Sequence, residues 1–162
     1  MIVVLSDTHI GDRAKALPVL LLERLKRLEP ELILHAGDIT AGFMLDELEK
    51  IAPLVAVRGN ADSLNLPLER VVEVGDFRIG LIHGHRFLSL NTQFLTLKAI
   101  NMDVDVLVFG HTHRRCFEFR TSHGRRVYLL NPGSPTFPRF DSPSFAVLKF
   151  NKEPSVQWVT FL

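Results

Sequence analysis

The chain has 162 residues, which is the length of one domain and is enough to bury a substantial core. Hydrophobic residues make up 46% of it and charged residues 23%, and the formal net charge is +1. This balance shows no global preference for nucleic acid or for a membrane surface. No apolar run approaches the roughly 20 residues that a membrane-spanning helix needs.

The N-terminus and the cysteine content indicate the compartment. The first apolar run is short, lacks a preceding basic segment and meets Asp7 at once, which is unlike a signal peptide. Cys116 is the only cysteine, so an intrachain disulfide is impossible, and its apolar neighbours favour inert packing. We therefore expect a single domain over residues 1–162 that works in the cytoplasm without a membrane partner.

The first third of the chain alternates between strand and helix patterns. Residues 2–5 form an apolar, β-branched run typical of a strand buried on both faces. Leucines at helical spacing predict an amphipathic helix over 17–28. Two further strands, 32–34 and 54–57, flank a short helix over 44–51. This succession predicts a parallel sheet with right-handed crossovers.

The rest of the chain is richer in strand signals. A hairpin is expected over 71–81, followed by a helix over 90–100 that Ser89 would cap, and a buried strand over 104–109. Only strand patterns follow, and we expect them to form a β-meander. Its strands would be 117–120, 127–130, 145–150 and 156–161.

Five predicted strands end in acidic, amide or imidazole side chains. These candidate ligands are Asp7, His9, Asp38, Asn60, His83, His111 and His113. Asp7-x-His9 alone fits a solvated turn better than a ligand pair, but the recurrence at strand ends favours a ligand-binding edge. A thiolate zinc site is excluded by the single cysteine. The set suffices for two divalent ions that share one carboxylate, and Gly59 and Gly110 are expected to supply the sharp backbone turns.

The order of these motifs resembles the signature of the calcineurin-like metallophosphoesterase superfamily. The motifs are Asp7-x-His9, Gly37-Asp38, Gly59-Asn60-x-Asp62, His83-Gly84-His85 and Gly110-His111-x-His113. The length and the missing insertions are similar to its small bacterial and archaeal phosphodiesterase branch, over Met1 to about Ser134. The resemblance implies an α/β fold, a four-layer αββα sandwich of two mixed β-sheets flanked by helices.

The resemblance also implies a set of metal ligands. Asp7, His9, Asp38 and His113 would hold one ion; Asp38, Asn60, His83 and His111 would hold a second, with Asp38 as the bridge. A hydroxide bridging the two ions would attack phosphorus. Carboxylate, imidazole and amide donors suit Mn²⁺, Fe²⁺, Zn²⁺ or Ni²⁺, and the resemblance favours Mn²⁺.

One position departs from the family pattern. Larger members have a histidine after the asparagine that helps to protonate the leaving oxygen, whereas this chain has Ala61. His85 would substitute for it or serve a structural role, so the expected catalytic residues are Asp38, Asn60 and His85. Because a general acid contributes on the order of 10² to 10⁴-fold, aryl phosphodiesters are the expected substrates. Asp62 would then either cap a turn or hold Asn60.

Several other polar and aromatic residues have more than one interpretation. His35 is expected to be a hydrogen-bonded core residue, and the turn 131–134 needs only turn formation to explain it. One or two arginines near the motifs would bind phosphate, with surface salt bridges as the alternative; these are Arg13, Arg58, Arg86, Arg114 and Arg115. Three aromatic residues would form either a dimer surface or core: Phe137, Phe140 and Trp158.

Three functional hypotheses follow. The first is a phosphodiesterase that acts on small substrates with a dinuclear metal centre. The second is a non-catalytic metal-binding or protein-interaction scaffold, because a eukaryotic retromer subunit resembles the same branch, although its lineage has lost ligand positions that are occupied here. The third is a phosphomonoesterase or nuclease, and the near-neutral charge gives no support for long nucleic acids.

Overall fold

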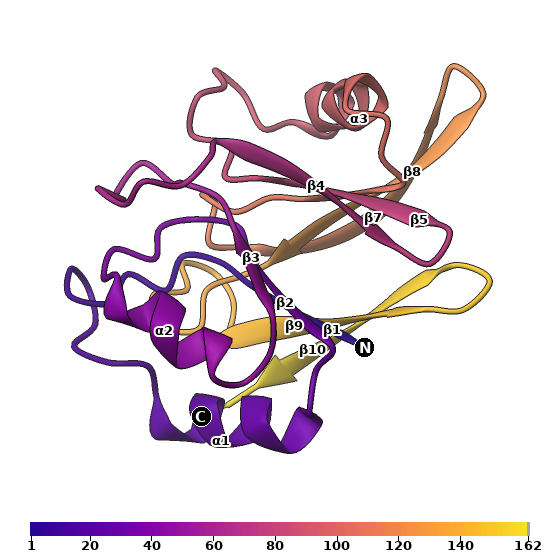
Figure 1. The fold of residues 1–162 in the computed structure, drawn as a ribbon. Helices are drawn as coiled ribbons and strands as arrows, with labels where there is room; N and C mark the ends of the chain where they lie inside the picture. The colour runs from indigo at the N-terminus through magenta and orange to yellow at the C-terminus, as the bar shows by residue number, and fades with distance from the viewer. Residues whose placement is uncertain (162) are drawn as a thin grey trace.

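Two five-stranded β-sheets pack face to face in the computed structural model, which describes residues 1–161 (Figure 1). The first sheet has the order β10-β9-β1-β2-β3. Its strands are β1 (Ile2–Leu5), β2 (Leu32–His35), β3 (Leu54–Ala56), β9 (Ser144–Phe150) and β10 (Pro154–Thr160). The second sheet has the order β4-β5-β6-β8-β7. Its strands are β4 (Glu69–Val74), β5 (Phe77–Ile82), β6 (Val106–Val108), β7 (Arg115–Ser122) and β8 (Arg125–Pro132).

Three helices cover the outer faces of the sheets. The helices are α1 (Val19–Leu28), α2 (Phe43–Glu49) and α3 (Thr92–Asn101). Figure 1 shows α1 and α2 below the first sheet and α3 above the second. Both sheets mix parallel and antiparallel pairs, so the predicted four-layer αββα sandwich is confirmed.

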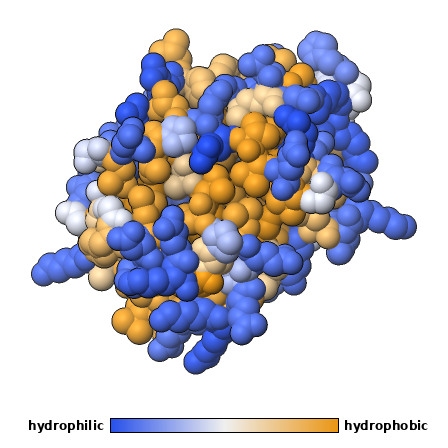
Figure 2. Space-filling view, viewed as in Figure 1, coloured by the Kyte–Doolittle hydropathy of each residue, from blue (hydrophilic) through white to orange (hydrophobic). Residues whose placement is uncertain are grey.

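Strand β1 shows how the sequence pattern produces this layering. Val3 and Leu5 pack on the side of α1 and α2, whereas Ile2 and Val4 face the second sheet. Because successive side chains of a strand point to opposite faces, a continuous apolar run is needed where both faces are covered. On the side where β3 and β4 form the sheet edges, apolar side chains remain visible between the layers (Figure 2).

The C-terminal strands do not form the predicted β-meander. β7 and β8 make a hairpin in the second sheet, whereas β9 and β10 make a hairpin in the first, where β9 pairs with β1. The connection over 133–143 carries the chain from one sheet to the other. A strand pattern records which face is buried but not which open sheet edge the strand will join, so the prediction of one continuous meander was wrong.

The predicted cap of the third helix was also wrong. Helix α3 begins at Thr92, and the side chain of Asn91 accepts a hydrogen bond from the Phe94 amide at 2.8 Å. Ser89 lies outside the helix, and its Oγ accepts hydrogen bonds from the backbone and side-chain nitrogens of Asn91. Asn91 caps more effectively because it stands directly before the first helical residue.

The parallel strands bring the polar loops to one edge of the sandwich. β1, β2 and β3 run parallel and therefore end on the same side, and β5 and β6 run parallel in the facing sheet. The loops of the two sheets touch: His83 Nδ1 lies 2.7 Å from the Ala36 carbonyl oxygen, and the His111 amide donates to Asp7. Within the described residues no helix is long and apolar enough to span a membrane.

Candidate metal centre

Four of the predicted ligands form one buried cluster, which we call the inner group: Asp7, His9, Asp38 and His113. One potential ligand atom from each lies within 4.8 Å of all the others. His9 Nε2 lies 3.4 Å from His113 Nε2 and 3.4 Å from Asp38 Oδ2, and His113 Nε2 lies 3.3 Å from Asp7 Oδ1. These are the four residues that the resemblance assigns to one ion.

The other predicted ligands converge beside it, and we call Asp38, Asn60, His83 and His111 the outer group. Asn60 Oδ1 lies 3.0 Å from His83 Nε2 and 3.1 Å from His111 Nδ1. His83 Nε2 lies 3.3 Å from Asp38 Oδ2, the same oxygen that faces His9. Asp38 therefore stands between the two groups, and Asn60 and His111 are the members that solvent reaches.

The chemistry of both groups fits divalent metal ions. Carboxylate oxygens, imidazole nitrogens and an amide oxygen aim lone pairs at common points, and these donor types suit first-row divalent ions. Burial raises the pKa of Asp7 above its usual range, although His83 and His113 lie beside it. Buried carboxylates need positive charge nearby, and a divalent ion would supply it.

Asp38 and His83 form a polarised pair between the two groups. Burial opposes ionisation of Asp38, but the hydrogen bond and positive charge of His83 outweigh it and lower the pKa of Asp38 to about 2. Burial likewise opposes the cationic form of His83, yet its contact with Asp38 raises the pKa of His83. The Ala61 amide donates to Asp38 Oδ1 at 2.8 Å and further holds the carboxylate in place.

Five of the candidate ligands have a left-handed backbone conformation. Their φ angles lie between 45° and 68°; they are Asp7, His9, Asp38, His111 and His113. Each non-glycine residue in this region costs roughly 1–2 kcal/mol. Such strain persists only where surrounding contacts hold it, and it concentrates at functional sites.

The two glycines serve a different purpose from the one predicted. Neither Gly59 nor Gly110 has a positive φ, and at the second turn the positive φ belongs to the ligand His111. A Cβ atom at Gly59 would collide with the Asp38 carboxylate, and one at Gly110 would collide with Ser6 Oγ. Glycine is needed at both positions because the backbone passes so close to these side chains.

Asp62 ties two ligand loops together. Its carboxylate accepts hydrogen bonds from the backbone amides of Asp38 at 2.9 Å, Thr40 at 2.7 Å and Gly59 at 2.8 Å. Of the two predicted roles, capping the local turn is therefore correct. The carboxylate contacts these amides and not the Asn60 side chain, because three N–H groups from two loops converge on it.

Two buried residues of the segment 131–134, which begins in β8, have a role that the sequence interpretation missed. Ser134 Oγ donates to the Asp7 carbonyl oxygen at 2.7 Å, and Asn131 Nδ2 donates to the Gly110 carbonyl oxygen at 3.0 Å. Thr136 Oγ1 adds a bond of 2.6 Å to the Thr8 carbonyl oxygen. Turn formation alone thus does not explain these residues. Polar side chains directly after an apolar strand were the available signal.

The remaining histidines near the centre differ in their contacts. His35 is fully buried and bonded to Thr8 Oγ1 and the Gly37 amide, which confirms a hydrogen-bonded core residue; burial lowers the pKa of His35 to about 3. His85 packs beside His83 with 5.4 Å between ring centroids, and burial lowers its pKa. His85 Nδ1 is buried without a hydrogen-bond partner among residues 1–161.

A cleft of about 160 Å³ opens over the two ligand groups. Its rim includes Arg13, whose guanidinium lies 5.2 Å from the Phe137 ring centroid, and Arg139, which the sequence interpretation missed. The Phe137 carbonyl oxygen lies 2.6 Å from His113 Nδ1. Arg13 is thus the one predicted arginine that lines this cleft.

The other arginines and aromatic residues lie elsewhere. Arg115 pairs with Asp141 at 3.6 Å, as the salt-bridge alternative predicts. Arg114 lies 5.8 Å from the ring centroid of Phe140, which is exposed. Trp158 is partly buried and packs against the core between the sheets.

Comparison with known proteins gives consistent matches along the chain. Residues 1–153 match the family described as the calcineurin-like phosphoesterase superfamily domain. A probable metallophosphoesterase of Methanothermobacter thermautotrophicus is 42% identical over 156 residues, covering 94% of this chain and 87% of that protein. Vps29 of Chaetomium thermophilum is 29% identical with a TM-score of 0.82, covering 98% of this chain and 94% of that one. Vps29 of Entamoeba histolytica, solved with Zn²⁺, is 29% identical with a TM-score of 0.79, covering 98% and 97%.

Sequence, fold and site agree on the family. The match to the family extends over nearly the whole chain. The archaeal relative is 42% identical to this chain, which is high enough to indicate a shared family and not only a shared fold. The clustered residues Asp7, His9, Asp38 and His113 form a possible metal-binding site. The chain therefore belongs to the calcineurin-like phosphoesterase superfamily, as the order of its motifs predicted.

Proposed function

We propose that this protein is a metal-dependent phosphodiesterase that hydrolyses small phosphodiesters with two divalent ions. The inner group would hold one ion and the outer group the other, with Asp38 as the shared ligand. The observation that supports this proposal most strongly is the position of Asp38 Oδ2, 3.4 Å from His9 Nε2 and 3.3 Å from His83 Nε2. Two ions held in this way would make an attacking water more acidic and neutralise charge that develops on phosphorus.

The residues around the ions would bind and orient the substrate. Arg13 and Arg139 line the cleft over both groups, where a guanidinium would donate charge-assisted hydrogen bonds to phosphate oxygens. Ala61 also lines the cleft and has no proton to give a leaving oxygen. Leaving groups that need little protonation, such as aryl oxides, are therefore favoured, and His85 remains our candidate for a proton donor.

Mn²⁺ is the metal that we propose for the active protein. Imidazole and carboxylate donors accept Mn²⁺, Fe²⁺, Zn²⁺ and Ni²⁺, and availability in the cell decides among them. The Zn²⁺ complex of Entamoeba histolytica Vps29, which is 29% identical to this chain, supports metal binding by this fold.

The test is hydrolysis of bis-p-nitrophenyl phosphate beside p-nitrophenyl phosphate by chelator-treated protein. Mn²⁺, Ni²⁺, Zn²⁺ or Mg²⁺ would be restored singly, and circular dichroism would verify folding. We expect the diester rate to return with metal and to exceed the monoester rate. A faster monoester rate would favour a phosphomonoesterase, and activity on single-stranded DNA alone would favour a nuclease.

A non-catalytic scaffold is the second candidate. The observation that favours it is the likeness to Vps29, one structure of which was solved with a bound cyclic peptide at 28% identity and a TM-score of 0.72. In this chain every ligand position predicted by the resemblance holds a residue type that can bind a metal, which supports catalysis. Folded protein that is inactive with all four metals would favour the scaffold.

The organisation and location of the protein are part of the same proposal. We propose that residues 1–162 form one domain that works in the cytoplasm, where a single half-buried thiol, Cys116, stays reduced. One cooperative urea transition and recovery of the protein in the cytosolic fraction are the expected results. Sedimentation velocity would show whether copies associate.

A further inference from the structure

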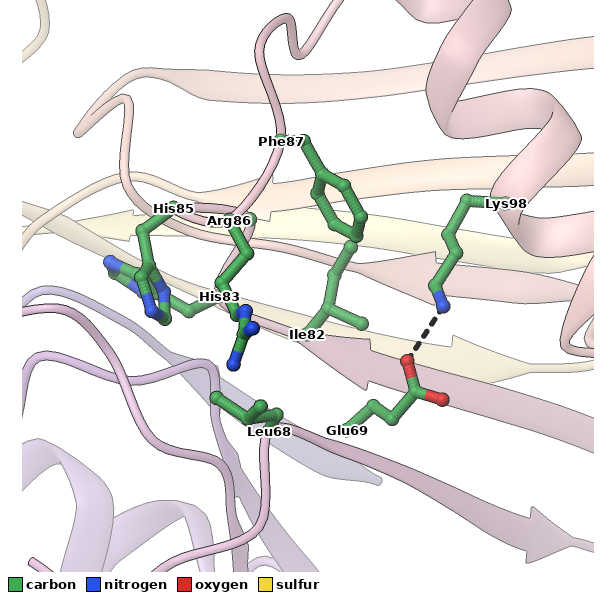
Figure 3. A pocket seen from close by; sticks show the side chains of 9 residues that line it. Leu68, Glu69, Ile82, His83, His85, Arg86, Phe87 and Lys98 are labelled. Atoms are coloured by element: carbon green, nitrogen blue, oxygen red, sulfur yellow. Dashed lines mark hydrogen bonds and ion pairs between the residues drawn. The ribbon is translucent and has the colours of Figure 1, made fainter.

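A second cavity of about 360 Å³ lies next to the candidate metal centre. It is formed between the start of β4, the end of β5 with the loop that follows, and helix α3. Figure 3 shows His83 and His85 at one end of it and the ion pair between Lys98 and Glu69 at the other. Its volume is within the range of small-molecule pockets in proteins.

The walls between these ends are apolar and include an aromatic ring. Phe87 and Ile82 lie on one side and Leu68 on the other (Figure 3). Lys98 adds its largely covered side chain, with Nζ 2.6 Å from Glu69 Oε2 and 5.8 Å from the Phe87 ring centroid. Such a surface favours a flat, weakly polar group that stacks on the ring, because aromatic pairs gain energy beyond the area they bury.

The end near the metal centre offers unused polar groups. His85 Nδ1 is buried and lacks a hydrogen-bond partner among residues 1–161, and Arg86 forms no ion pair within this range. An unpaired buried nitrogen costs free energy that a ligand oxygen would recover. A guanidinium binds phosphate oxygens and also stacks on aromatic rings.

The cavity and the metal centre share His83. This residue lines the cavity, and its Nε2 lies 3.3 Å from Asp38 Oδ2 and 3.0 Å from Asn60 Oδ1. A phosphate at the centre would therefore have this cavity on its His83 side and, on another side, the cleft with Arg13 that opens over both groups. A diester carries two organic groups, and each would have a separate space.

From this arrangement we infer that the cavity binds one aromatic ester group of the substrate, between a phenyl ring and a nucleobase in size. The ring would lie between Phe87 and Leu68, and its phosphate would point past His85 toward the outer group. The inference rests on the proposed function, because it requires the phosphate to bind at the metal centre. It defines the substrate class as aryl or nucleoside phosphodiesters and disfavours dialkyl ones.

The test compares two phosphonates that are not hydrolysed, phenylphosphonate and methylphosphonate, as inhibitors of bis-p-nitrophenyl phosphate hydrolysis by the Mn²⁺-loaded protein. Both present the same phosphonate group, and the comparison is made at an alkaline pH at which both are dianions, so that a difference between their inhibition constants reports on the ring. We expect phenylphosphonate to bind about tenfold more tightly or better, as is usual for an apolar group that fills a pocket. Equal inhibition constants would overturn the inference.

Two variants test whether the cavity causes the preference for phenylphosphonate over methylphosphonate. Leu68→Trp should fill the cavity, and Phe87→Leu should remove the ring while keeping an apolar side chain, so each should reduce the preference to about twofold or less. Leu97→Trp is the matched control, because Leu97 is an exposed leucine of α3 outside the cavity lining. If both cavity variants fold and keep the wild-type preference, the ring binds elsewhere and the inference is wrong.

A direct binding measurement separates this inference from the proposed function. Amide resonances of the Zn²⁺-loaded protein would be followed while phenylphosphonate is added, with Leu68, Phe87 and Lys98 as the expected responders. Hydrolysis without these shifts would leave the phosphodiesterase intact and remove the aromatic site. Shifts at these residues in a protein that hydrolyses no phosphoester would keep the site and remove the proposed reaction.

Discussion

The inner and outer ligand groups share Asp38 but differ in how firmly the fold holds them. All four inner residues are buried and all have positive φ angles, and the loops that carry Asp7 and His113 are anchored by Ser134 and Asn131. In the outer group Asn60 is exposed and His111 is half-buried. One half of the candidate site is therefore preorganised, whereas the other half is open to solvent.

This contrast predicts unequal metal affinities under the two-ion proposal. A preorganised site loses little conformational freedom on binding, whereas exposed ligands must be ordered by the ion. His113 and His83 are each oriented by a backbone carbonyl oxygen, that of Phe137 at 2.6 Å and that of Ala36 at 2.7 Å. Such contacts strengthen metal binding, and among residues 1–161 Asn60 has no comparable support beyond His83 and His111.

The largest effect is expected from Asp38→Asn, which would break both groups at once. The variant should lose hydrolysis of bis-p-nitrophenyl phosphate by about 10³-fold, because under the two-ion proposal charge stabilisation in the reaction would depend on both ions. Bound manganese, measured by inductively coupled plasma mass spectrometry, should fall below one ion per chain. Asp76→Asn, in the exposed turn between β4 and β5, is the control. Retention of two ions by Asp38→Asn would rule out the shared ligand.

His113→Ala and His111→Ala test the contrast between the groups directly. Each should reduce hydrolysis by about 10²-fold or more. Metal titration by calorimetry should differ: His111→Ala keeps the tighter binding step and His113→Ala loses it. If both variants lost the same step, the two groups would not be separate sites.

Ser134→Ala tests whether buried hydrogen bonds to the ligand loops strengthen metal binding by the inner group. Its hydroxyl donates to the Asp7 carbonyl oxygen and accepts from the Phe137 amide at 2.8 Å, so its loss should loosen both loops. We expect the tighter metal affinity to fall about tenfold, with the weaker step unchanged. Competition with a fluorescent chelator would measure both steps. Ser122→Ala, at the end of β7, is the control, and an equal effect there would contradict the prediction.

The smallest effect concerns His35, which lies beneath the inner group. Burial lowers the pKa of His35 to about 3, whereas an unfolded histidine has a pKa of about 6.5. Below pH 6.5 the unfolded chain gains a proton that the folded chain does not, so stability falls with falling pH, by up to about 1.4 kcal/mol for each pH unit. His35→Gln should flatten this dependence in urea unfolding of the chelator-treated protein between pH 7 and 5. An unchanged slope would mean that other groups cause the acid sensitivity.

The ligand residues were predictable because their signal is local in the sequence. Each follows an apolar strand, and parallel strands must end at the same edge of their sheet, so Asp7 and Asp38 had to meet. His83 and His111 follow β5 and β6 in the same way. The αββα layering followed from the family resemblance, and the two-faced apolar run of β1 agrees with it.

Only the tertiary structure showed what supports and surrounds these ligands. The close approach at Gly59, the anchoring by Asn131 and Ser134, and the place of Arg139 on the cleft all join segments far apart in the chain. The pairing of β9 with β1 also joins segments that are far apart in the chain. Strand periodicity and turn composition are properties of neighbouring residues, whereas these contacts depend on which sheet edge a strand joins and how closely two loops then pack.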